Sequence, residues 1–172
     1  MAIVRGDKFV DLLNTVLADE NIDREYKAFF AVCLSGGLRV SEGLALTKAN
    51  FIEDDGCLFF KVSVLKKRRH EERWCRVHPA AQSFVKEVLA TKVGTLFDWD
   101  PSTCLRRIKR HFQVEGICNH SLRHSAISYY LFEEKRTKEE TAKLCHVSSK
   151  IIDTYAHLDE RKVLKEMFKG AR

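Results

Sequence analysis

The chain has 172 residues, of which 45% are hydrophobic and 31% charged, and it carries a formal net charge of +6 with a pI near 9.0. This length fits one domain with its own core, so we expect residues 1–172 to form a single domain. No apolar run reaches the ~20 residues that span a bilayer, and the charged first residues do not suit a signal peptide. The six cysteines form no CxxC pair, which favours free thiols in a reduced cytoplasm over a disulfide or zinc framework.

The predicted elements are mainly helical, because apolar residues recur at helical spacing along most of the chain. In chain order the predicted helices cover residues 8–17, 24–34, 38–46, 79–93, 101–114, 122–132, 138–144 and 159–169. The stretch Cys57–Leu65 is rich in Phe and Val and predicts a strand, with Trp74–Val77 as its partner in one clear hairpin. The predicted fold class is therefore mainly α with a small antiparallel β-sheet (α+β).

Basic residues gather in two runs. The first lies at the predicted hairpin turn and the second on a predicted helix; their members are Lys66, Lys67, Arg68 and Arg69, then Arg106, Arg107, Lys109 and Arg110. A solvated surface is one interpretation of each run, and contact with DNA phosphates is the other. The basic pI suits a nucleic-acid partner without requiring one.

Two separate motifs in the first half of the chain suit phosphate chemistry. Arg39 follows a Gly-Gly break at a helix start, where a guanidinium fork and the helix N-terminus both attract an anion. The alternative is a surface arginine that is capped by Glu42. A lysine at the hairpin turn can reach into a groove and deliver a proton, and the alternative there is solubilising charge.

Two further pieces lie in the second half. His120 stands at a helix start with Arg123 one turn later, so both can face one point; helix capping is the alternative for the histidine. A zinc site is disfavoured because the HExxH glutamate is missing. His146 is followed nine residues later by Tyr155, which we expect to be exposed because its segment is polar; a half-buried core tyrosine is the alternative.

In this order and spacing, the four pieces resemble the tyrosine recombinase family of phage integrases and chromosome-dimer resolvases. That family reads GLR-[IV]-S-E, a lysine in a β-hairpin, H-x-L-R-H, and L-G-H with a tyrosine nine residues further on. The resemblance extends from about residue 8 to residue 168, and Val64-Leu65-Lys66-Lys67 aligned on the family's strand favours Lys67 over Lys66. The chain departs from the pattern at Cys145, where glycine is usual, and at Gly43, where a larger aliphatic residue is usual.

The resemblance implies an enzyme that cleaves and rejoins DNA strands through a 3′-phosphotyrosyl intermediate, with no metal, ATP or other cofactor. Tyr155 is the implied nucleophile, His120 the proton acceptor and Lys67 the acid for the departing 5′-oxygen. The phosphate oxygens would be held by the remaining members of the set, Arg39, Arg123 and His146. Glu42 is expected to anchor the arginine region, and the two basic runs are expected to bind DNA.

The resemblance also implies double-stranded DNA as the partner, with monomers in solution and a tetrameric synaptic complex on DNA. The C-terminal helix, within 158–172, is expected either to pack on its own domain or to dock on a neighbouring subunit. We expect no N-terminal core-binding domain and no membrane partner, and a cytoplasmic, nucleoid-associated location with a viral or mobile-element origin left open. Two alternatives remain: a type IB topoisomerase-like nicking-closing enzyme, and a non-catalytic DNA-binding regulator.

Overall fold

The computed structural model describes residues 9–66, 69–112, 118 and 120–155, without the side chains of 64–66, 69–70 and 111–112. Its helices are α1 Phe9–Ala18, α2 Arg24–Gly36, α3 Val40–Leu44, α4 Gln82–Thr91, α5 Pro101–Phe112, α6 Ser121–Ser128 and α7 Lys138–Cys145. The antiparallel sheet has the order β1-β2-β3, with β1 Phe51–Asp54, β2 Cys57–Lys66 and β3 Arg69–Arg76. The predicted fold class, mainly helical with a small antiparallel sheet, is confirmed.

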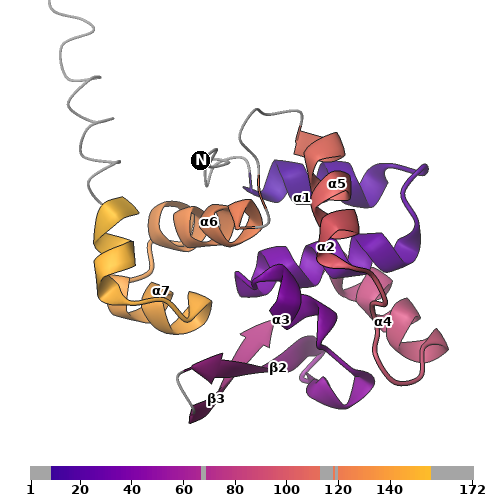
Figure 1. Cartoon of the computed structure of the whole chain (residues 1–172), viewed down its shortest axis with the longest axis horizontal. Helices are drawn as coiled ribbons and strands as arrows, with labels where there is room; N and C mark the ends of the chain where they lie inside the picture. The colour runs from indigo at the N-terminus through magenta and orange to yellow at the C-terminus, as the bar shows by residue number, and fades with distance from the viewer. Residues whose placement is uncertain (1–8, 67–68, 113–117, 119, 156–172) are drawn as a thin grey trace, which may run out of the picture.

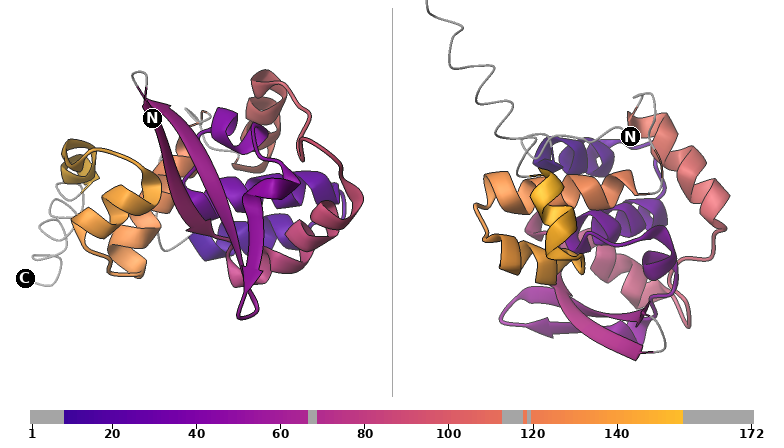
Figure 2. Two further views of the ribbon diagram at one scale, coloured as in Figure 1. Left: turned by 90° about the horizontal axis from the view of Figure 1, so that it is seen from below. Right: turned by 60° about the vertical axis from the view of Figure 1, so that its left-hand side comes forward.

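The elements divide into two groups on either side of α3 (Figures 1 and 2). The helices α6 and α7 lie at one end of the molecule, and α1, α2, α4 and α5 lie toward the other. The sheet runs along one edge of this helical body and lies beside both groups. This arrangement brings α3, β3, α6 and α7 close together, although they come from distant parts of the chain.

Helix α2 is the centre of the core, since every residue from Tyr26 to Gly36 is buried. Its N-terminus is capped by the Asp23 carboxylate, which accepts a hydrogen bond from the Tyr26 N–H at 2.8 Å. The helix ends where Gly37 adopts the left-handed region with φ 57°, a conformation that glycine takes without the usual steric cost. The predicted stop at the Gly-Gly pair is confirmed, and it places Arg39 at the start of α3.

The sheet is larger than predicted. Strand β3 begins at Arg69 instead of Trp74, and its pairing with β2 runs from Lys66 opposite Arg69 to Phe59 opposite Arg76. Apolar alternation did not predict the first part of this strand, because its residues are charged or polar. Strand β1 was not predicted at all; it is connected to β2 through residues 55 and 56, which both have positive φ.

Several helix boundaries also differ from the prediction. A 3₁₀ turn, Pro79–Ala81, precedes α4, and α6 continues into a π-helical turn, Tyr129–Glu133. Residues 149–155 form a helical segment that was not predicted. The predicted helix 159–169 lies outside the described residues. No helix in the described part of the chain is long and apolar enough to cross a membrane.

The six cysteines are free thiols, as their spacing predicted. Four of them are buried, namely Cys33, Cys75, Cys104 and Cys145. Burial raises the pKa of Cys75 to about 11 and that of Cys145 to about 12, so both thiols remain neutral at pH 7. They therefore add no negative charge to the region between β3 and α7.

Candidate active site

The carboxylate of Glu42 is the centre of the candidate site. It is only 8% exposed and accepts hydrogen bonds from Arg39, from the backbone N–H at 2.8 Å and from Nη1 at 2.9 Å. The Arg39 side chain is 45% exposed, so its guanidinium is fixed at one edge and open to solvent elsewhere. Glu42 therefore binds this arginine, as one of its two interpretations expects, and still leaves the guanidinium accessible to an anion.

Arg123 reaches the same carboxylate from α6. Its Nη1 lies 3.4 Å from Glu42 Oε2, and its Nη2 donates to the backbone carbonyl of His146 at 2.5 Å. The side chain is 5% exposed, so it is held almost entirely inside the protein. Burial lowers the pKa of the Arg123 guanidinium, Glu42 opposes that shift, and the positive charges of Arg39 and Arg73 reinforce it.

Arg73 is a third guanidinium in this cluster and was not predicted. It lies on β3 opposite Val62, and its Nη2 is 4.0 Å from Glu42 Oε2. Its Nη1 donates to Cys75 Sγ at 2.9 Å and to the backbone carbonyl of Leu144. The signal was present in the sequence, because alternation with the buried Cys75 and Val77 places Arg73 on the inward face of the strand.

The charges of this cluster do not balance. Three guanidinium groups, those of Arg39, Arg73 and Arg123, face the carboxylate of Glu42, so these four side chains carry two net positive charges. Burying unpaired charge is costly, so such a site favours an anion that completes the pairing. The bidentate geometry of guanidinium donors suits the oxygens of a phosphate.

His146 joins the cluster through its backbone and its ring. It ends α7 in the left-handed region with φ 50°, where a residue with a side chain is strained. Its carbonyl is held by Arg123, and its Nε2 lies 3.1 Å from Glu71 Oε2. Because Glu71 is half exposed on β3, its carboxylate is free to move away when another anion reaches the imidazole.

Tyr155 differs from the prediction. The prediction of an exposed tyrosine was wrong, because Tyr155 is only 4% exposed and belongs to the core. The helical segment 149–155 places its ring 5.6 Å from that of His124, in a stacked arrangement. Among the described residues its hydroxyl has no hydrogen-bond partner, and neither has His124 Nδ1. Since His124 follows Arg123 on α6, the phenol packs on the helix that carries one of the clustered arginines.

His120 occupies the N-cap position of α6, as predicted. Its side chain makes no capping hydrogen bond, so the capping alternative is not supported. The residue is exposed, and its charge contributes to lowering the pKa of His124. His120 is thus a solvent-accessible imidazole on the same helix as Arg123.

The structure describes only some members of the two basic runs. Lys67 and Arg68 lie outside the described residues, while Lys66 and Arg69 are paired across the hairpin with undescribed side chains. On α5, Arg107 pairs with Asp23 at 2.9 Å and packs over the rings of Tyr26 and Trp99. The other three members of that run, Arg106, Lys109 and Arg110, are exposed.

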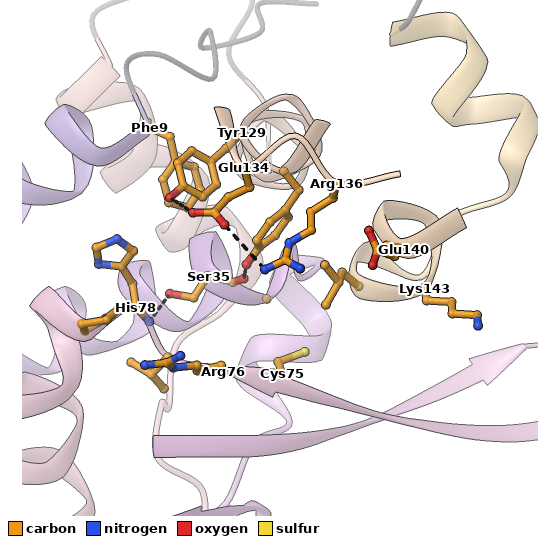
Figure 3. A pocket seen from close by; sticks show the side chains of 15 residues that line it. Phe9, Ser35, Cys75, Arg76, His78, Tyr129, Glu134, Arg136, Glu140 and Lys143 are labelled. Carbon is orange, nitrogen blue, oxygen red and sulfur yellow. Dashed lines mark hydrogen bonds and ion pairs between the residues drawn. The ribbon is translucent and has the colours of Figure 1, made fainter. Parts of the chain in front are cut away.

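A pocket of about 570 Å³ lies beside the cluster and not within it (Figure 3). Its walls come from α1, the end of β3, the π-helical turn and α7. In Figure 3 Tyr129 and Arg136 both point toward Glu134, which accepts a hydrogen bond from the tyrosine and pairs with the arginine. None of the five predicted catalytic residues that the structure describes lines this pocket, so it is distinct from the candidate site.

Two departures from the family pattern have a packing explanation. A Cβ on Gly43 would lie 2.6 Å from Cys33 Sγ, so α3 can approach α2 only with glycine there. A Cβ on Gly37 would lie 2.9 Å from Cys145 Sγ, which shows how tightly α7 packs on the end of α2. Cys145 therefore fills space behind the His146 turn and removes no reactive group.

No model of a known protein family and no curated protein sequence matches this chain. Solved structures do match it. The XerH site-specific recombinase bound to palindromic difH substrate has a TM-score of 0.77 at 16% identity, over 99% of this chain and 54% of that chain. The catalytic domain of bacteriophage HP1 integrase has a TM-score of 0.65 at 16% identity, over 99% of this chain and 98% of that chain. The Tn1549 transposon integrase in complex with circular intermediate DNA has a TM-score of 0.66 at 11% identity, over 94% of this chain and 67% of that chain.

The extent of these matches differs. The chain spans about half the length of the XerH recombinase and nearly all of the HP1 catalytic domain. The likeness therefore concerns only part of the XerH recombinase.

Proposed function

Since this chain has the tyrosine recombinase catalytic-domain fold, we propose that it cleaves and rejoins DNA strands through a covalent 3′-phosphotyrosyl intermediate on Tyr155. The single observation that carries the proposal is the Glu42 cluster. Arg39 and Arg123 are distant in sequence, yet both bind one carboxylate in a site with excess positive charge. A DNA phosphate is an anion that balances this charge.

The arginines would act on the phosphate. In the transition state of phosphoryl transfer, negative charge is spread over the non-bridging oxygens, and preorganised donors stabilise it. Glu42 orients Arg39 and Arg123 before the substrate arrives, so little reorganisation is needed when the charge develops. His146 would donate a further hydrogen bond once its contact with Glu71 is broken.

Tyr155 would be the nucleophile and form the covalent link. A phenol has a pKa of about 10, so it needs a proton acceptor at neutral pH, and the accessible His120 on α6 suits that role. Burial of the ring against His124 keeps the hydroxyl from water in the free protein. Lys67, which lies outside the described residues, would protonate the departing 5′-oxygen, and this assignment rests on the sequence alone.

Double-stranded DNA is the proposed partner, with assembly of several protomers on it. Exposed Arg106, Lys109 and Arg110 would contact the backbone, whereas Arg107 is engaged within the protein. Binding through phosphates should weaken with salt, with a slope of about −0.9 for each phosphate contact in a plot of log affinity against log salt.

Covalent trapping tests the proposal. A nicked suicide DNA substrate, from which the released fragment diffuses away, should give an adduct with the wild-type chain that survives SDS. Tyr155→Phe should bind the same DNA and form no adduct, because the nucleophile is missing. Tyr129→Phe is the matched control, since this tyrosine pairs with Glu134 beside the separate pocket and should leave the adduct intact. An adduct of equal yield from Tyr155→Phe would refute the assignment.

A further inference from the structure

Arg73 connects Glu42 on α3 with the C-terminal end of α7, as Arg123 does from α6. Its guanidinium is 8% exposed and faces Glu42 on α3 on one side and the Leu144 carbonyl of α7 on the other. Leu144 is in the last turn of α7, where backbone carbonyls lack partners within the helix. A cation that donates there also complements the negative end of the helix dipole.

The turn that follows Leu144 needs such support. His146 adopts φ 50°, a left-handed conformation that is unfavourable for a residue other than glycine and persists only where its surroundings enforce it. Two side chains from outside α7 hold this turn: Arg73 at the carbonyl of Leu144 and Arg123 at that of His146. Both guanidiniums also face Glu42, so the carboxylate ties the turn to α3.

We propose that Arg73 is a positioning residue that fixes the His146 turn, and thereby aims the His146 imidazole at the scissile phosphate. The inference rests on the proposed function and adds a residue that acts through His146. Arg73 is buried beneath the turn, so it contributes to the reaction by orientation and not by touching DNA. Its effect should therefore appear in the rate of cleavage and not in DNA affinity.

Two substitutions test this role. Arg73→Met keeps the length of the side chain and removes every donor, and Arg73→Lys keeps the charge but cannot bridge Glu42 and Leu144 together. We expect Arg73→Met to lower the single-turnover cleavage rate by about 10- to 100-fold, because a misplacement of about 1 Å is enough for such a loss. Arg73→Lys should fall between Arg73→Met and wild type. Arg76→Met, on the outward face of the same strand, is the matched control and should stay within about twofold in rate and affinity.

A double-mutant cycle separates positioning from general support of the fold. In a His146→Ala background, the cost of Arg73→Met should shrink to about threefold or less, because the group that Arg73 aims is already absent. If the full cost persists in that background, or if Arg73→Met cleaves at the wild-type rate, the inference is wrong.

Hydrogen exchange gives a readout that does not depend on activity. The Val147 N–H donates to the Ala142 carbonyl at 3.0 Å and closes the end of α7. Its exchange should speed up by at least about tenfold in Arg73→Met, and not in Arg76→Met, because the turn loses its anchor. Unchanged exchange would overturn the anchoring role by itself. If the wild-type chain forms no covalent adduct, the proposed function fails, and this measurement still decides whether Arg73 holds the turn.

Discussion

The Glu42 cluster and the Tyr155 segment are built in opposite ways. In the cluster, side chains from α3, β3 and α6 share a carboxylate, and their donors also hold backbone carbonyls of α7. At Tyr155 the ring is fixed by stacking on His124, while its hydroxyl has no partner within the described part of the chain. On the proposed function, this comparison predicts that the phosphate-binding half of the site is assembled before DNA arrives, and that the Tyr155 hydroxyl becomes hydrogen-bonded only in the complex.

The largest expected effect comes from removing the Glu42 carboxylate that the three arginines share. Glu42→Ala should lower the free energy of unfolding by about 3–5 kcal/mol, because it leaves buried guanidiniums without their counter-ion. Denaturant unfolding followed by circular dichroism measures the change. Glu53→Gln is the control, since its pair with Lys86 is exposed and should be worth about 0–1 kcal/mol. Equal, small losses for the two variants would mean that the cluster is not a structural unit.

A second substitution separates catalysis from stability within the cluster. Arg39 is 45% exposed, so Arg39→Ala should leave the melting temperature nearly unchanged and lower the cleavage rate by about 10²- to 10³-fold. Arg123→Ala should lower both quantities, because that guanidinium is buried and holds the His146 carbonyl. Single-turnover trapping and thermal melting of the two variants give the answer. An Arg39→Ala protein that cleaves as fast as wild type would remove this arginine from the site.

The packing of Tyr155 on His124 can be tested through the pH dependence of the free energy of unfolding. Burial, reinforced by the charges of His120 and Arg123, lowers the pKa of His124 to about 4. An unfolded histidine titrates near 6.5, so between about pH 6.5 and 4 the unfolded chain binds a proton that the folded chain does not. Stability from this group should therefore be complete above about pH 6.5 and fall by at most about 3 kcal/mol as the pH drops to 4.

His124→Phe is the matched variant, because it keeps an aromatic ring to stack on Tyr155 and cannot titrate. Its unfolding free energy should depend less on pH across the same window than that of wild type. Parallel pH profiles of the two proteins would show that His124 is not held neutral in the fold.

The smallest expected effect concerns Glu71, which occupies His146 Nε2 in the free protein. Glu71→Gln should tighten DNA binding by a few-fold, equivalent to about 1 kcal/mol or less, because the half-exposed contact no longer competes with phosphate. Fluorescence anisotropy at fixed salt measures the affinity. Glu72→Gln changes the charge by the same amount on the same strand but pairs with Lys61, so it isolates the contribution of the His146 contact. If both variants bind alike, Glu71 does not compete for the imidazole.

The sequence predicted the fold class and most helices, because their apolar spacing and the Gly-Gly stop are local signals. It also predicted that Arg39 starts a helix and that His120 precedes one. The length of β3 and the presence of β1 were not predictable from apolar alternation, since the first five residues of β3 are all polar or charged, and β1 has two apolar residues followed by two acidic ones. The burial of Tyr155 was mispredicted because its neighbours in sequence are polar, whereas its environment is set by His124 on another helix.

Arg73 shows a different limit of sequence reasoning. Its inward direction follows from alternation with Cys75 and Val77, yet its partners Glu42 and Leu144 lie on elements that only the fold brings together. Motif spacing can indicate which residues react, but it does not reveal which buried side chains hold them in place.

The most direct test of the account is to identify the residue that carries the DNA. After suicide-substrate trapping, nuclease and trypsin digestion should yield the peptide 151–161, which follows Lys150 and ends at Arg161, with a nucleotide attached to Tyr155. Tandem mass spectrometry that places the nucleotide on this phenol is the predicted result. A nucleotide on another residue, or an adduct that Tyr155→Phe still forms, would contradict the central claim.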